Sequence, residues 1–253
     1  PNGATASTTY DSNARPSTET SADGAVTTYV YTNSPPTVKA TTNSHWVKTT
    51  TDGFGRTIKV ERGDSSSTKS IVDTEYEPCA CSPLGKVKRT SLPYAPGGTV
   101  YWATNTYDAL GRTVAVALPN GAGTTTYAYV HNTVTATDPA GKWKKYENDA
   151  LGNVTKTTEP NPAGGTWDTT FSYSVVNKLV QVQMTRGSVT QTRSWTYDSA
   201  TQRLSSETHP ETGTTSYSYN ADGSLASRTL ANGKTLQFSY DSLGRVTSIL
   251  DMA

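Results

Sequence analysis

The sequence predicts an all-β protein built from antiparallel hairpin repeats, and three observations carry this prediction. Turn-forming residues recur about every ten or eleven residues, which is the interval that hairpin-linked strands produce. The segments between the turns alternate aromatic and polar residues with the period of two that a strand requires. Thr, Val, Tyr and Gly also occur at a density that disfavours helices.

Turn signals follow one another along the whole chain. Asn120-Gly121, Asp222-Gly223 and Asn232-Gly233 are dipeptides that favour type I′ hairpin turns. Ser65 to Ser70 has the composition of a mobile loop tip. The turn positions are Asn2-Gly3, Ser12-Asn13, Asp23-Gly24, Asn33 to Pro36, Asn43-Ser44, Gly53 to Gly55, Gly63-Asp64, Gly111, Gly121, Asn132, Gly141, Gly152, Gly164-Gly165, Asn177-Lys178, Gly187, Gly213, Gly223, Gly233 and Gly244.

Short strands are expected between these turns, and the clearest ones each carry an aromatic-x-aromatic pair. Side chains at positions i and i+2 lie on one face of a strand, so stacked hairpins would place these rings in a ladder. The expected strands are Thr28 to Thr32, Thr124 to Val130, Thr169 to Ser174, Arg193 to Tyr197, Thr215 to Tyr219 and Thr235 to Tyr240.

A six-residue motif is repeated at several of the turns. An aromatic residue ends one strand, an Asp carboxylate accepts backbone N–H bonds in an Asx turn, and Gly supplies a positive φ. An Arg then opens the return strand, close enough across the turn to meet the Asp. The copies are Tyr107-Asp108-Ala109-Leu110-Gly111-Arg112 and Tyr240-Asp241-Ser242-Leu243-Gly244-Arg245, with looser variants at Asn148 to Asn153 (containing Asp149 and Gly152), Thr51 to Arg56, Tyr197-Asp198 and Tyr219 to Gly223.

These motif copies resemble the RHS/YD-repeat family, and the resemblance extends over essentially the whole chain. It implies that consecutive hairpins stack into a curved, spiralling sheet that forms a shell wall or a β-solenoid-like body. Members of this family often enclose a C-terminal toxin or act as surface modules, and some have been linked to carbohydrate binding. We therefore interpret residues 1–253 as one repeat region, with a less regular stretch at residues 64–106.

Composition limits the functional classes further. The apolar fraction is 33% and the mean hydropathy is −0.58, which is low for a densely packed globule but suits a thin repeat sheet with much surface. The 22 basic and 21 acidic residues are well mixed, which disfavours nucleic-acid binding. No stretch has the apolar length of a membrane span. The composition also suits the outside of a bacterial cell.

The residues that could carry chemistry are better explained as structure. Asp52, Asp108, Asp149, Asp198 and Asp241 recur at one turn position, whereas a glycosidase needs one pair of carboxylates. His45, His131 and His209 are isolated, with no second His or Cys at the spacing of metal ligands. No nucleophile elbow or phosphate loop is present. We expect no catalytic residue, no cofactor and no metal ion.

Cys79 and Cys81 flank a single Ala between Pro78 and Pro83. In an extended strand their Cα atoms would lie near the upper limit for a disulfide, so a local bridge requires a bent backbone. We favour this bridge as a staple of the turn. Free thiols, half of a metal site and a bridge to another chain remain alternatives.

Asp138-Pro139-Ala140-Gly141 resembles part of the family's self-cleaving element, but Lys142 stands where that element has Leu. The rest of the signature is missing, so we expect an ordinary repeat turn here. No cleavage activity is transferred to this chain.

The sequence thus predicts a non-enzymatic structural segment of a secreted or cell-surface bacterial protein. The alternatives are a carbohydrate-binding or adhesive module and a self-assembling fibre subunit. The edge segments Thr5 to Tyr10 and Arg245 to Leu250 lack Pro and carry at most one charge each. We expect further repeats of the same polypeptide, or identical chains stacked end to end, to cover them, with enclosed cargo or glycans as other partners.

Overall fold

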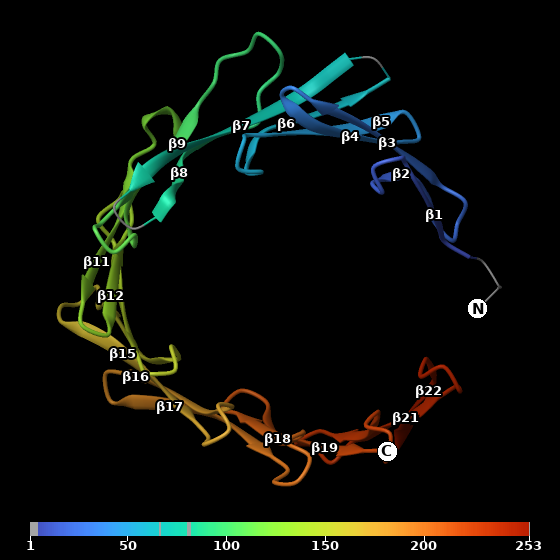
Figure 1. Cartoon of the computed structure of the whole chain (residues 1–253). Helices are drawn as coiled ribbons and strands as arrows, with labels where there is room; N and C mark the ends of the chain where they lie inside the picture. The colour runs from blue at the N-terminus through green and yellow to red at the C-terminus, as the bar shows by residue number, and fades with distance from the viewer. Residues whose placement is uncertain (1–4, 66, 80–81, 253) are drawn as a thin grey trace. The chain divides into compact units, whose positions relative to one another are not determined.

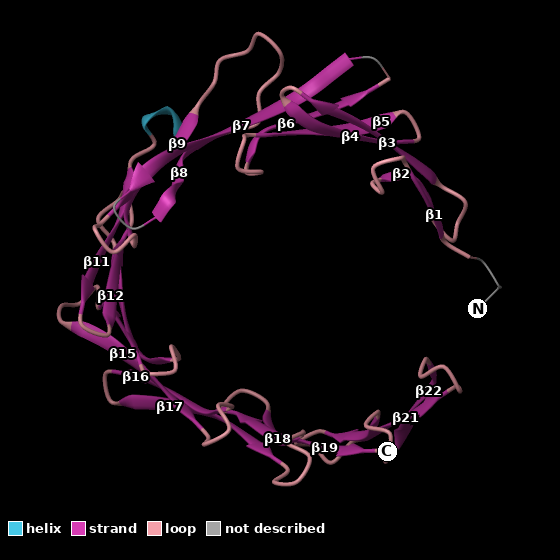
Figure 2. Cartoon of the chain, in the orientation of Figure 1, coloured by secondary structure: helices cyan, strands magenta, loops and turns pink. Residues whose placement is uncertain are grey.

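The computed structural model describes residues 5–65, 67–79 and 82–252. Apart from one short 3-10 turn, η1 (Pro119–Gly121), every regular element in these residues is a strand, as Figure 2 shows. The prediction of an all-β fold is confirmed. The strands are β1 (Ser7–Tyr10), β2 (Pro16–Thr20), β3 (Val26–Asn33), β4 (Pro36–Thr42), β5 (His45–Thr51), β6 (Thr57–Asp64), β7 (Ser67–Cys79), β8 (Ser82–Ser91), β9 (Trp102–Tyr107), β10 (Thr113–Ala117), β11 (Thr124–Val130), β12 (Thr133–Thr137), β13 (Trp143–Asn148), β14 (Val154–Pro160), β15 (Thr166–Tyr173), β16 (Leu179–Arg186), β17 (Val189–Tyr197), β18 (Leu204–His209), β19 (Gly213–Tyr219), β20 (Leu225–Thr229), β21 (Thr235–Tyr240) and β22 (Val246–Met252).

Strands that follow one another in the sequence pair antiparallel in two series, and Figure 1 labels many of these strands. The pairing runs in order from β1 to β11 and from β13 to β22. Such an order needs only short turns, because each strand returns beside the one before it. The predicted series of hairpins is therefore confirmed.

The chain divides into two compact units. Unit 1 comprises residues 1–127 and 137–141, and unit 2 comprises residues 128–136 and 142–253. The stretch 64–106 lies within unit 1 and contains β7, which has 13 residues, and β8, which has 10. The pairing of β7 with β8 shifts register twice. A loop follows β8, and it reaches β7 through the isolated bridge between Ile71 and Tyr94.

The described side chains do not form a closed core. Among the described residues, Trp46 is the one buried hydrophobic side chain, with 7% of its surface exposed. The accessible surface of the chain is 15697 Å², whereas a compact protein of this mass exposes about 11,000 Å². The described strands therefore bury little of their surface.

The two faces of unit 2 differ in chemistry. One face, which we call the hydroxyl face, carries Ser, Thr and Gln in register across the strands, with hydroxyl contacts such as Thr208–Thr214 at 2.9 Å and Ser218–Ser227 at 2.7 Å. The other, the aromatic face, carries rings, aliphatic groups and charges. The hydroxyl face contains Thr170, Ser172, Gln181, Gln183, Thr192, Ser194, Thr196, Ser206, Thr208, Thr214, Ser216, Ser218, Ser227, Thr229, Thr235 and Gln237.

Two local predictions are wrong. Ser67 to Ser70 do not form a loop tip, because β7 already begins at Ser67 and pairs with Asp64 of β6. Asp222 and Asn232 lack the positive φ of a type I′ turn, which only the following glycines adopt. Asn120 and Gly121 do both have positive φ, at 56° and 69°, as that turn type requires.

Within residues 5–65, 67–79 and 82–252, no helix has the length and apolar character needed to cross a membrane.

Candidate functional site

The motif turn is a closed ring of hydrogen bonds around one aspartate. One carboxylate oxygen of Asp108 accepts the backbone N–H groups of Leu110 and Arg112 at 3.0 and 2.9 Å. The other oxygen accepts from the Arg112 guanidinium at 2.8 Å, and a second guanidinium nitrogen lies 2.7 Å away. The backbone N–H of Asp108 also donates to the carbonyl of Arg112 at 3.0 Å. The structure thus brings Asp108 and Arg112 together across the turn.

The same geometry recurs at other copies. Asp241 accepts the N–H groups of Leu243 and Arg245 at 2.9 Å each, and the Arg245 guanidinium at 2.7 Å. Asp149 has the looser form, because Asn153 takes the place of the Arg and its amide donates to the carboxylate at 3.0 Å. Asp11–Arg15 and Asp52–Arg56 are further pairs of this kind.

These contacts hold the turn carboxylates in their charged form. Backbone and side-chain hydrogen bonds from Arg112 keep the pKa of Asp108 below its ordinary value. The pKa of Asp241 is lowered in the same way by Arg245. An aspartate that serves as a general acid needs a raised pKa instead, so the arrangement is suited to capping a turn.

The glycines of the motif occupy positions that other residues rarely adopt. Gly111, Gly152 and Gly244 have φ of 77°, 86° and 76°, and a Cβ at such angles is strained. The register of the return strand then shifts by one residue, as at Val114, which lies between the pairs Thr113–Tyr107 and Ala115–Thr106. Such a β-bulge bends the strand directly after the turn.

The tyrosine hydroxyl of several repeats reaches back to the hairpin before it. The Tyr107 hydroxyl donates to the carbonyl of Val87 at 2.8 Å, and the Tyr240 hydroxyl donates to the carbonyl of Leu225 at 2.9 Å. In each case the acceptor directly follows the residue that stands at the Arg position of the preceding turn. The other bonds are Tyr31 to Pro16, Tyr76 to Thr57, Tyr173 to Val154 and Tyr219 to Leu204, at 2.9 to 3.1 Å.

A cation of the preceding turn often covers the same tyrosine ring. The guanidinium carbon of Arg56 lies 4.2 Å from the centroid of the Tyr76 ring, within the range of a cation–π interaction. One Arg therefore pairs with the Asp of its own turn and stacks on the Tyr of the next repeat. Similar contacts join Arg15 to Tyr31, Lys86 to Tyr107, Lys178 to Tyr197 and Arg203 to Tyr219.

Sequence reasoning identified the residues of the turn but missed these contacts between repeats. The expected aromatic ladder gave no acceptor for the hydroxyls, since the acceptor carbonyls lie 15 to 20 residues away. A basic residue directly precedes the acceptors Pro16, Thr57, Val87 and Leu204, and this placement was a signal that could have found them.

The remaining candidate residues lie apart from one another. His45 opens β5, His131 lies in a turn with φ of 52°, and His209 lies in β18 with its Nε2 3.4 Å from Glu207. In the described part of the chain, no three His, Cys, Asp or Glu side chains gather as a metal site would require. Cys81 lies outside the described residues, so its bridge to Cys79 stays a prediction.

Asp138 to Gly141 has the geometry of the other repeat turns. The Asp138 carboxylate accepts the N–H of Ala140 at 2.9 Å, and the Gly141 N–H donates to the Asp138 carbonyl at 3.0 Å. Gly141 has a φ of 77°. This is the ordinary turn that the sequence predicts.

A shallow groove lies on the aromatic face of unit 2. It encloses about 530 Å³ over β13 to β16, and we call it the Met184 groove. Tyr146, Val154, Phe171, Val182 and Met184 give it an apolar lining, and its charged residues are Lys144, Glu159 and Arg186.

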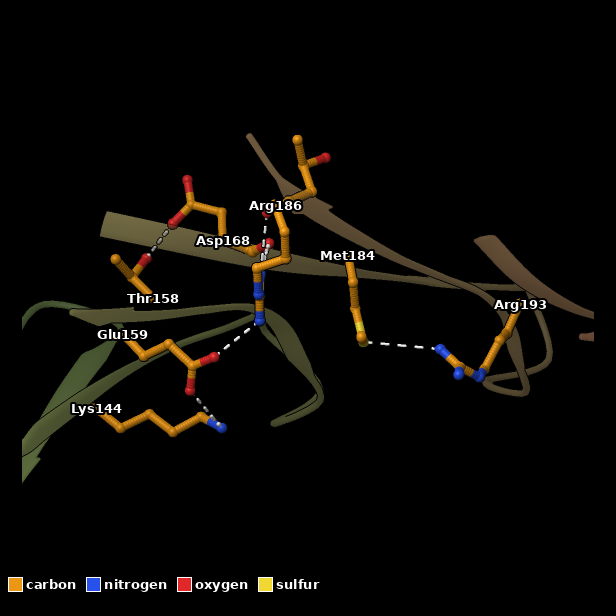
Figure 3. A network of polar contacts seen from close by, with 8 residues as sticks. Lys144, Thr158, Glu159, Asp168, Met184, Arg186 and Arg193 are labelled. Atoms are coloured by element: carbon orange, nitrogen blue, oxygen red, sulfur yellow. Dashed lines mark hydrogen bonds and ion pairs between the residues drawn. The ribbon is translucent and has the colours of Figure 1, made fainter. Parts of the chain in front are cut away.

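Charged side chains next to the Met184 groove form the network in Figure 3. The Glu159 carboxylate lies 3.5 Å from the Lys144 ammonium and accepts from the Arg186 guanidinium at 2.8 Å. Arg186 also donates to the Asp168 carbonyl at 3.2 Å. On the other side of Met184, a guanidinium nitrogen of Arg193 lies 3.7 Å from the thioether sulfur.

Unit 1 has a larger concave region of about 870 Å³ over β5 to β7. Its charges are matched across neighbouring strands, with Lys48 3.0 Å from Glu61 and Lys59 3.6 Å from Asp73. These pairs stand opposite one another in the strand register. They stabilise the sheet and leave no unbalanced charge for a ligand.

Residues 219–251, which contain three consecutive turns and the Asp241–Arg245 pair, match the family model described as RHS Repeat. The chain contains an RHS repeat. The sequence resemblance to RHS/YD repeats is thereby confirmed. The RHS turn at Asp241 has the same hydrogen bonds as the turn at Asp108, so this geometry extends beyond the matched segment.

The fold of this chain also occurs in a solved structure. The crystal structure of TcdB2-TccC3-TEV matches it with a TM-score of 0.63 and 16% sequence identity, over 90% of this chain and 13% of that chain. At this identity the match concerns the fold alone. The crystal structure of TcdB2-TccC3 aligns with 98% of this chain and 18% of that chain at 13% identity. Its TM-score of 0.32 is too low to support a shared fold. No curated protein matches the chain in sequence.

Proposed function

We propose that this chain is a non-enzymatic structural segment of a wall built from RHS repeats, in a secreted or cell-surface bacterial protein. The observation that carries the proposal is the contact between successive hairpins. Tyrosine hydroxyls of several repeats bind the hairpin before them, as Tyr107 binds Val87, and at several of these repeats a basic residue of that hairpin covers the ring, as Lys86 does. Repeating this contact adds one hairpin after another in the same direction, and the contact sets no limit to the number of hairpins.

The low burial of the strands supports a role as a partition. A sheet that buries almost no side chain completely exposes both of its faces, and this suits a wall with water or another chain on either side. A domain that works alone normally covers one face of its sheet to obtain a core.

The use of the aspartates supports a non-enzymatic role. Asp108, Asp149 and Asp241 each accept backbone N–H groups in their own turn, and none of them pairs with a second carboxylate there. Capping of the turn is one physical reason that explains every copy of the motif aspartate.

The alternative of sugar binding through aromatic rings has less support. A sugar stacks on an open ring face, but cations already lie over Tyr31, Tyr76 and Trp102 at 4.2 Å. We therefore keep the wall as the proposed function.

We propose further RHS repeats of the same polypeptide as the main partners, and an enclosed cargo polypeptide as the content of the wall. The length of the structural neighbour supports this, since the chain corresponds to 13% of that chain. β22 pairs with β21 along one edge, and its side chains Val246, Ile249, Leu250 and Met252 are each at least half exposed. A strand in this state offers its free edge to another strand.

Association of the isolated chain tests this proposal. We expect the 253-residue chain to form irregular aggregates in light scattering and electron microscopy, because its edges lack partners. Ile249→Lys should keep it monomeric, since a charge on an edge strand opposes pairing. Leu110→Lys, at a turn tip that is still more exposed, is the control and should not change association.

Each outcome separates the alternatives. Ordered filaments would identify a fibre subunit in place of a wall segment. A stable monomer at high concentration, with slow amide exchange in both β1 and β22, would contradict the proposal.

A further inference from the structure

The Met184 groove combines an apolar lining with cations that the groove itself does not balance. We propose that it binds an extended polypeptide segment in which a carboxylate side chain stands between large apolar side chains. The inference rests on the proposed wall function only for the source of that segment, which is the enclosed polypeptide.

The apolar lining comes from the strand register. Phe171 stands opposite Val182, and Met184 stands opposite Thr169, so their side chains lie on one face of the two neighbouring strands β15 and β16. The side chains of Phe171, Val182 and Met184 are only half-buried. Burying a few such side chains under a partner removes apolar surface from water, which favours binding.

The anion preference comes from Arg193. One of its guanidinium nitrogens binds Glu211, but among the described residues another has only the Met184 sulfur as a partner, at 3.7 Å, as Figure 3 shows. A thioether is a weak acceptor, so this donor would gain a charge-assisted bond from an incoming carboxylate. Because Met184 lines the groove, that carboxylate would lie at the groove's edge.

The local charge balance agrees with this preference. Lys144, Arg186 and Arg193 supply three positive charges around the groove, and Glu159 and Glu211 supply two negative ones. The net charge of these five side chains is therefore +1. A partner with one carboxylate among apolar residues complements both the lining and the charge.

The shape of the site favours a polypeptide over a small molecule. The groove is open along the sheet, so it would leave much of a small ligand in water, whereas pockets for such ligands bury most of their surface. An extended segment can lie along the strands and place alternate side chains into the groove. The hydroxyl face on the opposite side lacks the aromatic and Arg residues that dominate binding energy.

The test uses three acetylated and amidated pentapeptides, Leu-Phe-Asp-Leu-Phe and its Asn and Lys counterparts, titrated by calorimetry into the full chain. We expect the Asp peptide to bind with a Kd below about 1 mM. It should bind about tenfold more tightly than the Asn peptide, since one charge-assisted hydrogen bond is lost. The Lys peptide should bind most weakly.

Variants assign the effect to the groove. Arg193→Gln should remove the difference between the Asp and Asn peptides, while Arg62→Gln, on β6 of unit 1, should preserve it. Phe171→Ser should weaken the binding of all three peptides by the same factor. No binding at about 1 mM, equal affinity of wild type for the Asp and Asn peptides, or a difference that persists in Arg193→Gln would each overturn the proposal.

The comparison of peptides on wild type needs no variant to fold. Repeating it on the Ile249→Lys chain separates this proposal from the wall, because that variant blocks edge pairing without touching the groove. Peptide binding without association, or the reverse, identifies which of the two proposals fails.

Discussion

At the scale of single residues, the Tyr-Asp pair of the motif serves two different hairpins. The aspartate closes its own turn, as Asp241 does with Arg245. The tyrosine beside it binds backwards, as Tyr240 does with the carbonyl of Leu225. Of two adjacent residues, the aspartate thus stabilises its own repeat and the tyrosine links that repeat to the preceding one.

Removing one tyrosine hydroxyl tests the second link. We expect Tyr219→Phe to lower the free energy of unfolding by about 1 kcal/mol, because the Leu204 carbonyl loses its half-buried donor. Urea unfolding measures the change. Tyr10→Phe is the matched control, since Tyr10 also precedes an Asp but its hydroxyl bonds to none of the described residues. Equal losses in both variants would show that the hydroxyl bond is irrelevant.

The turn aspartates predict how stability depends on acid. The pKa of Asp108 lies below its ordinary value of 3.8 because the N–H groups of Arg112 bind its charged form. A lowered folded pKa contributes stability above the unfolded value of about 3.9, and this contribution is lost as the pH falls through the folded pKa. The pKa is lowered in the same direction for Asp11, Asp149, Asp198, Asp222 and Asp241.

We therefore expect the urea midpoint to be nearly constant from neutral pH to about pH 5 and to fall steeply below about pH 4. Asp108→Asn should be less stable than wild type at neutral pH, because the amide loses the charge that pairs with Arg112. The gap between the two proteins should narrow in acid. A gap that stays constant at all pH values would mean that the Asp108 charge does not contribute.

At the scale of the elements, the strands of unit 2 separate two chemistries by simple alternation. β19 shows this in its exposure, with Ser216 and Ser218 exposed and Tyr217 and Tyr219 half-buried. The hydroxyl face can stay in water at no cost, while the aromatic face carries the contacts between repeats. A shift of one residue in register would exchange the two faces.

Large-to-small substitutions measure how little of this sheet is closed. We expect Trp46→Ala to lower the free energy of unfolding by about 3–5 kcal/mol, as in a true core, since Trp46 is 7% exposed. Phe171→Ala should cost clearly less, because the open groove already leaves part of its ring in water. Thermal and urea unfolding compare the two variants. A larger loss for Phe171→Ala would mean that the groove is covered in solution.

At the scale of the whole molecule, strands from β1 to β11 and from β13 to β22 pair with the strands next to them in sequence. Cooperative unfolding of such an array spreads from neighbour to neighbour. A local change therefore has a local effect, unlike a change in the core of a globule, which every element shares.

Gly152→Ala tests this locality. The φ of 86° at this position has open space around it, so the substitution costs about 1–2 kcal/mol through backbone strain alone. We expect faster amide exchange in β13 to β15 and unchanged exchange in β1 to β6, measured by mass spectrometry. Gly53→Ala is the control, because Gly53 has no left-handed φ and also has open space. Faster exchange throughout the chain would contradict the repeat-like coupling.

Much of the fold could be predicted because its signals are local. The expected strands Thr124 to Val130 and Thr235 to Tyr240 have the same bounds as β11 and β21, since alternation and turn residues act over a few positions. The loop expected at Ser65 to Ser70 failed because pairing with Gly63 and Asp64 draws Ser67 and Thr68 into β7. There the partner strand overrides the weak strand preference of serine.

The sequence alone was sufficient for the hairpin order, the turn chemistry of Asp108 and Arg112, and the alternation that separates the faces. Only the tertiary structure decided which carbonyl each tyrosine binds, which cation covers its ring, and that Met184 and Arg193 meet at one groove. The physical reason is range. Backbone torsion and turn capping depend on neighbours within about six residues, whereas these contacts depend on strand register and bulges, which become defined only when the hairpins pack side by side.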